Sequence, residues 1–213
     1  MPATRTDIKE VIAGPLSSLE DLLWEWVTLQ ERTARLWGWK DPLWWSGERA
    51  SLGGFAGAIW RVGGIVLEEY PTQKLSRIRA GRQQANAIGR GDMDFTLASV
   101  DFVVEAKQCW PGLTRQSLPY IESCVADAER DVRLATAPSQ YQRLAVVFAA
   151  PSSIRADSID ERILDWVDTA RGIKGCAFAC VFPGRTRTLR WQQDSRIYPG
   201  AAIFMKRVSS RSR

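Results

Sequence analysis

Apolar residues recur along this chain of 213 residues with two different periods. Apolar positions three or four apart, the spacing of one helix face, predict four helices at residues 17–37, 46–61, 119–135 and 158–171. In the first of these the apolar face consists of Leu19, Leu22, Leu23, Trp26, Leu29 and Leu36. Each helix is therefore expected to bury one side against another layer of structure.

Between and after these helices the pattern is typical of strands. Strands are predicted at residues 65–70, 91–97, 101–107, 144–150 and 175–182, with the first ended by Pro71, and further candidates lie at 188–192 and 201–208. The runs at 144–150 and 175–182 are continuously apolar, as expected of strands buried on both faces. From about residue 48 the order is αβββαβαβ, which predicts an α/β protein with a central mixed β-sheet flanked by helices.

The length fits one well-buried domain and is too short for two of ordinary size. We expect a single domain over residues 1–213. It would have a Trp-rich helical extension at 1–45, a core at 46–182, and a β appendage with a basic tail at 183–213.

Seven of the ten tryptophans fall between Trp24 and Trp60. Large aromatic side chains at this density predict an aromatic mini-core that fixes the first helix to the domain. The alternative is an aromatic surface that stacks on bases or meets a protein partner.

Composition narrows the chemistry. The chain contains no histidine, which excludes Ser-His-Asp and Cys-His catalysis, histidine zinc sites and a histidine general base. The net charge of +5 favours a polyanionic partner. No secretory signal or membrane span is expected, and four cysteines without a paired framework predict a cytoplasmic location.

Acidic residues and a lysine gather on the two strands at 91–97 and 101–107. Side chains two apart on a strand share a face, so Asp92 and Asp94 lie together, as do Glu105 and Lys107. A hairpin of these strands would bring an Asp, the Glu and the Lys to one place. Two carboxylates favour a divalent cation, and a lysine can position water or stabilise negative charge.

This arrangement resembles the PD-(D/E)XK nuclease superfamily, in which an Asp on one strand is followed by Glu/Asp-x-Lys on the next. Asp94 matches the Asp and residues 105–107 match the E-x-K, while Met93 replaces the proline of the motif. The resemblance implies a restriction-endonuclease-like αβββαβ core and a Mg²⁺-dependent nuclease acting on DNA, with Mn²⁺ as a substitute cation. Asp94, Glu105 and the main-chain carbonyl of Ala106 would bind the metal, and Lys107 would orient the nucleophile. Asp92 could replace Asp94 as the ligand.

Two further groups of residues extend this site. In the nuclease fold a helix before the first strand often contributes another Glu, for which Glu48 is the candidate; otherwise Glu48 only favours the positive helix N-terminus. The stretch 74–90 is expected to be mostly loop and contains no acidic residue. Beside a phosphodiester site its basic residues would bind the nucleic-acid backbone, although such runs also occur as solvated surface. They are Lys74, Arg77, Arg79, Arg82 and Arg90.

Other functions fit the same sequence. The chain could be a catalytically inactive nucleic-acid-binding module of the nuclease fold, or a subunit that docks through its Trp-rich region. A homodimer and a larger defence or repair assembly are both open. Glu105 and Lys107 could also form an ordinary cross-strand charge pair on the surface of an α/β domain.

Overall fold

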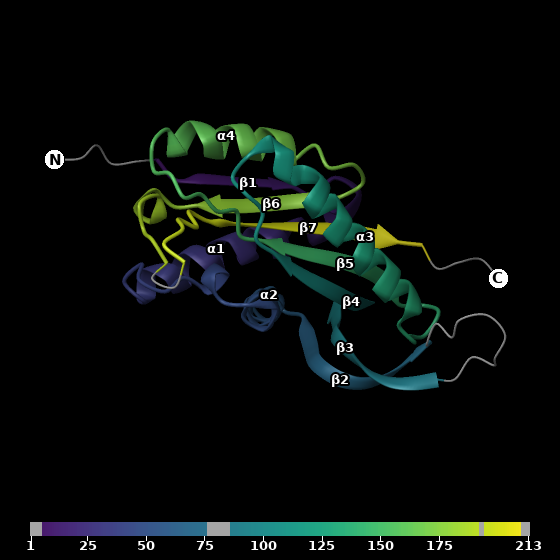
Figure 1. The fold of residues 1–213 in the computed structure, drawn as a ribbon. Coiled ribbons are helices and arrows are strands. Elements are labelled where there is room, and N and C mark those ends of the chain that lie inside the picture. The colour runs from purple at the N-terminus through teal and green to yellow at the C-terminus, as the bar shows by residue number, and fades with distance from the viewer. Residues whose placement is uncertain (1–5, 76–85, 192–193, 210–213) are drawn as a thin grey trace.

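The computed structural model describes residues 6–75, 86–191 and 194–209; for residues 69–75 and 86–91 only the backbone is described. A mixed sheet of seven strands in the order β1-β6-β7-β5-β4-β3-β2 forms the centre of the molecule. Helices cover both faces of this sheet (Figure 1). The predicted α/β class with a central mixed sheet is confirmed.

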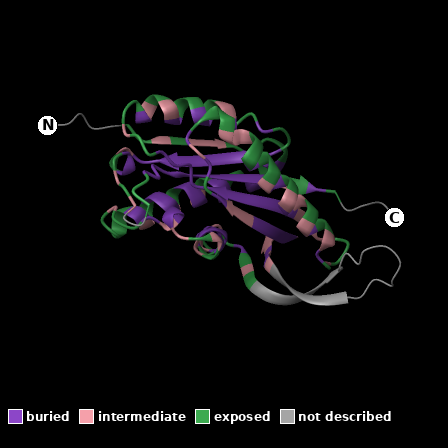
Figure 2. Ribbon diagram, in the orientation of Figure 1, coloured by how far each residue is buried: buried purple, intermediate pink, exposed green. Residues whose placement is uncertain are grey.

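The four helices lie where the apolar spacing predicts them. They are α1 (Glu20–Leu36), α2 (Glu48–Arg61), α3 (Leu118–Leu134) and α4 (Ile159–Ala170). The first two bury their apolar faces in one core cluster, and the last two in a second cluster on the opposite side of the sheet. The inner strands between these clusters, at residues 100–109, 142–149, 177–182 and 201–208, are mostly buried (Figure 2).

The strands are β1 (Ile8–Ile12), β2 (Ile65–Leu75), β3 (Asn86–Leu97), β4 (Val100–Cys109), β5 (Gln142–Ala149), β6 (Ala177–Phe182) and β7 (Ala201–Val208). Among the ladders of the described strands, β4 pairs with β5 in parallel and the others are antiparallel. From α2 to β5 the order is αβββαβ, the order expected for the core. A hairpin of β2 and β3 projects from the end of the sheet (Figure 1).

Three expectations are corrected by the structure. Residues 1–45 are more than a helical extension, because β1 pairs with β6 and forms one edge of the sheet. Strand β7 is no appendage, since it lies between β6 and β5 inside the sheet. The strand expected at 188–192 is absent from residues 188–191, whose only ladder contact is the isolated bridge between Arg190 and Ile197.

The expected loop at 74–90 is also partly strand. Strand β2 continues through Pro71 to Leu75, and β3 already begins at Asn86. Proline has no N–H to donate to a β-ladder, and it is therefore found mainly on edge strands. Strand β2 is at the edge of the sheet and can accommodate Pro71. The β2–β3 hairpin is therefore longer than the sequence pattern suggests.

The tryptophans divide between the two interpretations. Trp26, Trp44 and Trp45 are buried, and the indole N–H groups of Trp44 and Trp45 both donate to the carbonyl of Tyr198. This contact fixes the segment between α1 and α2 to the chain just before β7. Trp24, Trp37 and Trp60 are instead about half exposed.

Candidate active site

The candidate site lies where β3 separates from β4. The β3–β4 ladder runs from the turn at Leu97 and Val100 to the pair Met93 and Val104. Beyond that pair β3 continues in its ladder with β2. Main-chain groups of β4 past Val104 that face β3 must therefore find other partners.

Two carboxylates take up these main-chain groups. The N–H of Ala106 donates to Oδ2 of Asp92 at 2.8 Å. The N–H of Gln108, one strand repeat further on, donates to Oε2 of Glu48 at 3.0 Å. Asp92 and Glu48 are thus held on the same edge of β4. Their N–H donors, Ala106 and Gln108, are the two sequence neighbours of Lys107.

Local structure explains why Glu48 reaches this edge. It is the first residue of α2, and its helix is fixed to the sheet by Phe55, which contacts the rings of Phe95 and Phe148 at centroid distances of 6.2 and 6.1 Å. Ser51, one turn after Glu48, donates to the side-chain oxygen of Gln108 at 2.7 Å. The helix start is therefore bound to β4 by two hydrogen bonds.

The two carboxylates interact unfavourably. Burial raises the pKa of Glu48, and the negative charge of Asp92 raises it further, against the lowering effects of Lys107 and of the Gln108 N–H. Glu48 therefore lies close enough to Asp92 to feel its charge. Two like charges held near each other by the fold favour a cation in their vicinity.

Lys107 forms an ion pair on the face of the sheet that α3 covers. Its Nζ lies 2.9 Å from Oδ2 of Asp131 on α3. Burial alone would lower the pKa of Lys107, but the hydrogen bond and charge of Asp131, followed by the charges of Asp92 and Glu48, raise it above its ordinary value. Lys107 is consequently a cation at neutral pH.

Glu105 lies in the same region. It is 1% exposed, and the β3–β4 register places it across from Asp92, one step beyond the last ladder pair. Residues directly opposite in an antiparallel pair point to the same face, so Asp92, Glu105 and Lys107 share the face toward α3. The predicted association of an Asp, Glu105 and Lys107 on one face agrees with this register.

The two aspartates lie at different places along β3. Asp94 lies opposite Val103, one strand repeat nearer the turn, and shares the face of Asp92. Asp92 is the aspartate that bonds to β4 beside Glu105 and interacts electrostatically with Glu48 and Lys107. The sequence pattern favours Asp94, and the hydrogen bond to Ala106 makes Asp92 a candidate ligand as well.

The oxygen donors suit a hard cation. In a β-strand the N–H and C=O of one residue point the same way, so the carbonyl of Ala106 also faces the side where β3 has separated. Within residues 6–75, 86–191 and 194–209, no three Asp, Glu or Cys side chains are placed so that they could hold a metal ion together. Mg²⁺ is commonly bound through one or two carboxylates, with water and substrate phosphates completing its shell, and the donors at this edge fit that mode.

Sequence reasoning missed Asp131, Gln108 and Ser51. Asp131 and Ser51 lie on helices remote in sequence from β4, and neither belongs to a motif. Gln108 directly follows the E-x-K motif, and an amide side chain there was the one available signal.

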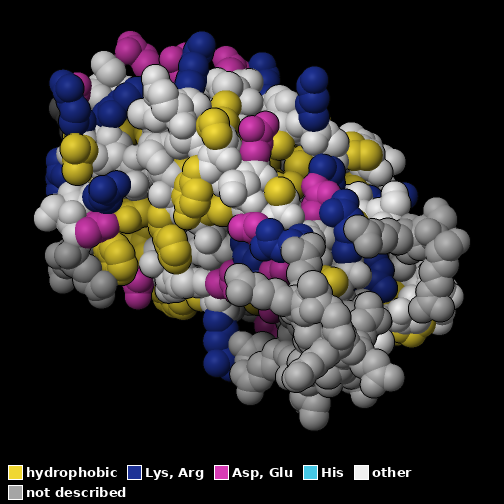
Figure 3. Space-filling model, turned by 45° about the vertical axis from the view of Figure 1, so that its right-hand side comes forward, with side chains coloured by type: hydrophobic (Ala, Val, Ile, Leu, Met, Phe, Trp, Pro, Cys, Tyr) yellow, Lys and Arg dark blue, Asp and Glu magenta, His cyan; other side chains and the backbone are white. Residues whose placement is uncertain are grey.

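The predicted nucleic-acid-binding residues can be placed only in part. Arg77, Arg79 and Arg82 lie outside the described residues, and for Lys74 and Arg90 only the strand backbone is described. Figure 3 shows acidic and basic side chains intermingled on the face next to the grey segment.

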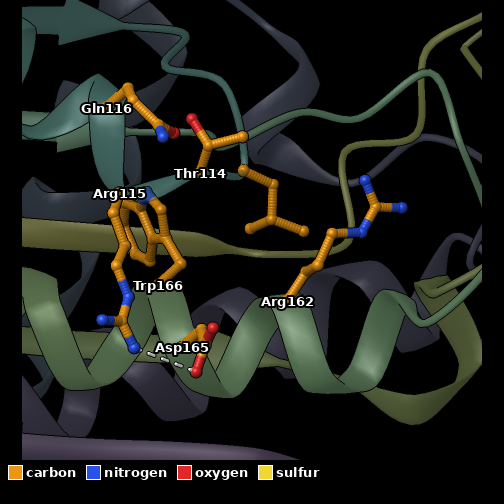
Figure 4. A pocket seen from close by; sticks show the side chains of 7 residues that line it. Thr114, Arg115, Gln116, Arg162, Asp165 and Trp166 are labelled. Atoms are coloured by element: carbon orange, nitrogen blue, oxygen red, sulfur yellow. Dashed lines mark hydrogen bonds and ion pairs between the residues drawn. The ribbon is translucent and has the colours of Figure 1, made fainter.

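A surface pocket of about 260 Å³ lies elsewhere, between α4 and the segment after β4 (Figure 4). Arg115 pairs with Asp165 at 3.3 Å beside it, and Arg162 is bonded to Ser153 and to the carbonyls of residues 155 and 157. None of the predicted catalytic residues lines this pocket. It is therefore separate from the carboxylate site.

Comparisons with protein-family models, with curated proteins and with solved structures give no match. In the described part of the chain no helix is both long enough and apolar enough to cross a membrane. The proposed function is therefore based on the geometry of the site.

Proposed function

We propose that this protein is a Mg²⁺-dependent nuclease that hydrolyses phosphodiester bonds in DNA. The observation that carries the proposal is the end of the β3–β4 ladder. There Asp92 accepts a hydrogen bond from the N–H of Ala106, and Glu48 accepts one from the N–H of Gln108. The cationic Lys107 lies between these two donors in the sequence. The combination of two carboxylates and a lysine on one strand edge suits hydrolysis of a polyanion without a histidine.

Each residue has a defined part in this proposal. Asp92, Glu105 and the carbonyl of Ala106 would hold the cation, with Asp94 as the alternative aspartate and Mn²⁺ as a substitute. The cation supplies Lewis-acid stabilisation of the phosphate and a more acidic water. Lys107, kept protonated by Asp131, orients the water through hydrogen bonds and stabilises charge that develops on the phosphate. Glu48 contributes negative charge at the same edge.

The resemblance to the PD-(D/E)XK superfamily supports the same reading. The αβββαβ order from α2 to β5, with the acidic residues on β3 and β4, agrees with the restriction-endonuclease-like core. The four cysteines are free thiols, which supports a reducing location such as the cytoplasm. Lys74 and Arg90 lie on the two strands of the hairpin that carries Asp92. We propose that these two residues, together with Arg77, Arg79 and Arg82 of the sequence between them, contact the DNA backbone.

Cleavage assays test the proposal. Plasmid DNA, single-stranded DNA and RNA are incubated with the protein in Mg²⁺, in Mn²⁺ and in a chelator. Metal-dependent cleavage of DNA is expected. Lys107→Met and Glu105→Gln should lower its rate by about 100-fold or more, as expected when a group that stabilises transition-state charge is removed. Asp165→Asn, which alters the pocket of Figure 4, is the matched control and should cleave normally.

The opposite results have clear meanings. Cleavage by Lys107→Met at the wild-type rate would refute the assignment of the site. Salt-sensitive DNA binding that needs no metal, without cleavage by the wild type, would show an inactive nucleic-acid-binding module instead.

A role in a larger assembly is a second candidate, favoured by one observation. Trp24 and Trp60 are 42% and 54% exposed, and the Arg61–Glu25 ion pair joins α1 and α2 beside them. Exposed aromatic side chains of this size are enriched in interfaces. Light scattering of the wild type and of a Trp24→Ser, Trp60→Ser variant would test it, because a lower mass for the variant is expected only if this surface joins copies of the chain.

A further inference from the structure

The pocket of Figure 4 lies beyond the carboxyl ends of the two parallel strands, β4 and β5. The segments that follow these strands are held side by side, because the N–H of Leu113 donates to the carbonyl of Ser152 at 2.7 Å. Residues 113–116 line one side of the pocket, and α4, the helix that follows β5, lines the other. In open α/β sheets, ligands commonly bind outside the carboxyl ends of parallel strands.

One of the lining residues carries a buried hydrogen-bond donor that lacks an acceptor. Trp166 on α4 is 0% exposed, and its indole Nε1 finds no partner among the described residues. Buried polar groups are nearly always hydrogen-bonded in native proteins, so this N–H calls for an acceptor from outside the chain. The Trp166 ring extends from α4 toward the segment that carries Thr114 and Arg115 (Figure 4). An acceptor held in the pocket beside that segment would satisfy the donor.

Arg115 supplies a second donor group, and it can change partners. Its Nη2 lies 3.3 Å from Oδ1 of Asp165, and the two side chains are 65% and 66% exposed. An exposed ion pair with such a long contact contributes little to stability. The guanidinium has five N–H donors in a planar fork that matches the two oxygens of a carboxylate. Arg115 can therefore turn from Asp165 to a ligand in the pocket.

The charges of the lining residues favour an anion with a single negative charge. Arg115 and Arg162 oppose Asp165, which leaves one net positive charge around the pocket. Arg162 is held in place by hydrogen bonds to the Ser153 hydroxyl and to two main-chain carbonyls, so its charge is fixed there. A carboxylate carries one negative charge, whereas a phosphate monoester carries nearly two at neutral pH and would be repelled more strongly by Asp165.

The size of the pocket limits the rest of the ligand. Its volume of about 260 Å³ is below the roughly 300–1,000 Å³ of pockets that hold drug-sized molecules. A short organic acid fits this space. Leu113 and Trp166 offer apolar surface to its carbon chain, and Thr114 and Gln116 offer a hydroxyl and an amide to a polar substituent.

We propose that this pocket binds a small organic monocarboxylate. The carboxylate takes the place of Asp165 as the partner of Arg115, and it accepts a hydrogen bond from the indole N–H of Trp166. The pocket is separate from the candidate active site, and its ligand is not a nucleic acid. Binding there does not depend on nuclease activity.

NMR spectroscopy of the ¹⁵N-labelled protein tests the proposal. Each of the ten tryptophans has an indole N–H, and the signal that is lost in Trp166→Phe belongs to Trp166. Acetate, butyrate and lactate are titrated separately at constant ionic strength, with inorganic phosphate as the other class of anion. We expect a saturable shift of the Trp166 indole signal with at least one carboxylate, and weaker binding of phosphate.

Three variants test the assigned contacts. Arg115→Ser should weaken binding at least about tenfold, because a hydrogen bond between charged groups is lost. Asp165→Asn should strengthen binding, since it removes the carboxylate that competes for Arg115. Arg155→Ser is the charge-matched control, because Arg155 pairs with Asp157 and does not line the pocket, and it should bind as the wild type does.

Three results would overturn the proposal. They are an unchanged Trp166 signal with every carboxylate, tighter binding of phosphate than of the carboxylates, and equal affinity of Arg115→Ser and the wild type.

Discussion

The Lys107–Asp131 ion pair offers a quantitative test of the electrostatics of the candidate site. The Nζ–Oδ2 distance is 2.9 Å, and the two side chains are 32% and 30% exposed. With an effective dielectric constant of about 20, two charges at 2.9 Å attract by about 6 kcal/mol before desolvation is subtracted. Fully exposed pairs retain about 0.2–1 kcal/mol, and breaking a buried pair costs about 3–5 kcal/mol. We expect a coupling free energy of about 1–2 kcal/mol for this partly buried pair.

A double-mutant cycle measures this quantity. Urea unfolding is followed for the wild type, Lys107→Met, Asp131→Asn and the double variant, and the coupling is the non-additive part of the unfolding free energies. The pair Arg155–Asp157 is the control, because its ion-pair distance is 3.0 Å but its side chains are 72% and 63% exposed. Its coupling should stay below about 0.5 kcal/mol. A Lys107–Asp131 coupling no larger than the control's would refute the reasoning that burial strengthens this pair.

The pair also fixes a pH dependence. Because the folded-state pKa of Lys107 is raised above 10.5, the folded protein binds this proton more tightly than the unfolded chain. The stabilisation is fully present below pH 10.5 and is lost as the pH rises through the folded-state pKa. Asp131→Asn should remove most of this alkaline loss.

Three other predictions concern single residues. Glu48→Gln should make the metal-free protein more stable at pH 7, because the folded-state pKa of Glu48 is raised and its ionisation costs stability. Urea unfolding across pH should show this difference shrink as the pH falls through the raised pKa and vanish below pH 4.5. Gly200→Ala should lower the free energy of unfolding by more than about 3 kcal/mol, because the new Cβ would overlap the carbonyl of Val181. Gly53→Ala on α2 is the contrast: its Cβ meets no atom, and the free energy of unfolding should rise by about 0.5–1 kcal/mol in the same assay. Ser99 has a φ of 64° in the β3–β4 turn, a conformation that is strained for a residue with a side chain. Ser99→Gly should remove about 1 kcal/mol of this strain and raise the melting temperature by about 2–4 °C. An unchanged melting temperature would show that the turn is unstrained.

Periodicity carried most of the fold prediction, and its failures have local reasons. Strand β1 is a short run, Ile8–Ile12, without clear alternation, and it is held by β6, about 170 residues away. Its existence depends on a distant partner that sequence spacing does not reveal. The alternation at Leu189 and Trp191 looks like a strand, yet Arg190 between them forms only an isolated bridge with Ile197, and its side chain donates to the carbonyls of Ile154 and Ser195.

In the candidate site, too, local periodicity predicted part of the arrangement, and tertiary contacts determined the rest. Strand alternation placed Glu105 and Lys107 on one face, and helix spacing placed Glu48 at the start of α2. The choice between Asp92 and Asp94 depends on where the β3–β4 ladder ends, which is a property of the curved hairpin and not of the local pattern. The role of Asp131 could not be predicted from the sequence, because Asp131 contacts Lys107 only through the tertiary packing of α3 against the face of the sheet.

Cation binding tests the central claim most directly. Binding of Mn²⁺ is measured by the loss of the free-ion electron paramagnetic resonance signal, for the wild type, Asp92→Asn, Asp94→Asn and the control Asp165→Asn. We predict that the wild type and Asp165→Asn bind Mn²⁺ equally, and that Asp92→Asn binds at least about tenfold more weakly, since even outer-shell changes cost about 10–100-fold. A larger loss for Asp94→Asn than for Asp92→Asn would move the ligand one strand repeat toward the turn. Equal binding by the wild type and both β3 variants, or no binding by the wild type, would contradict a cation site at the end of the β3–β4 ladder.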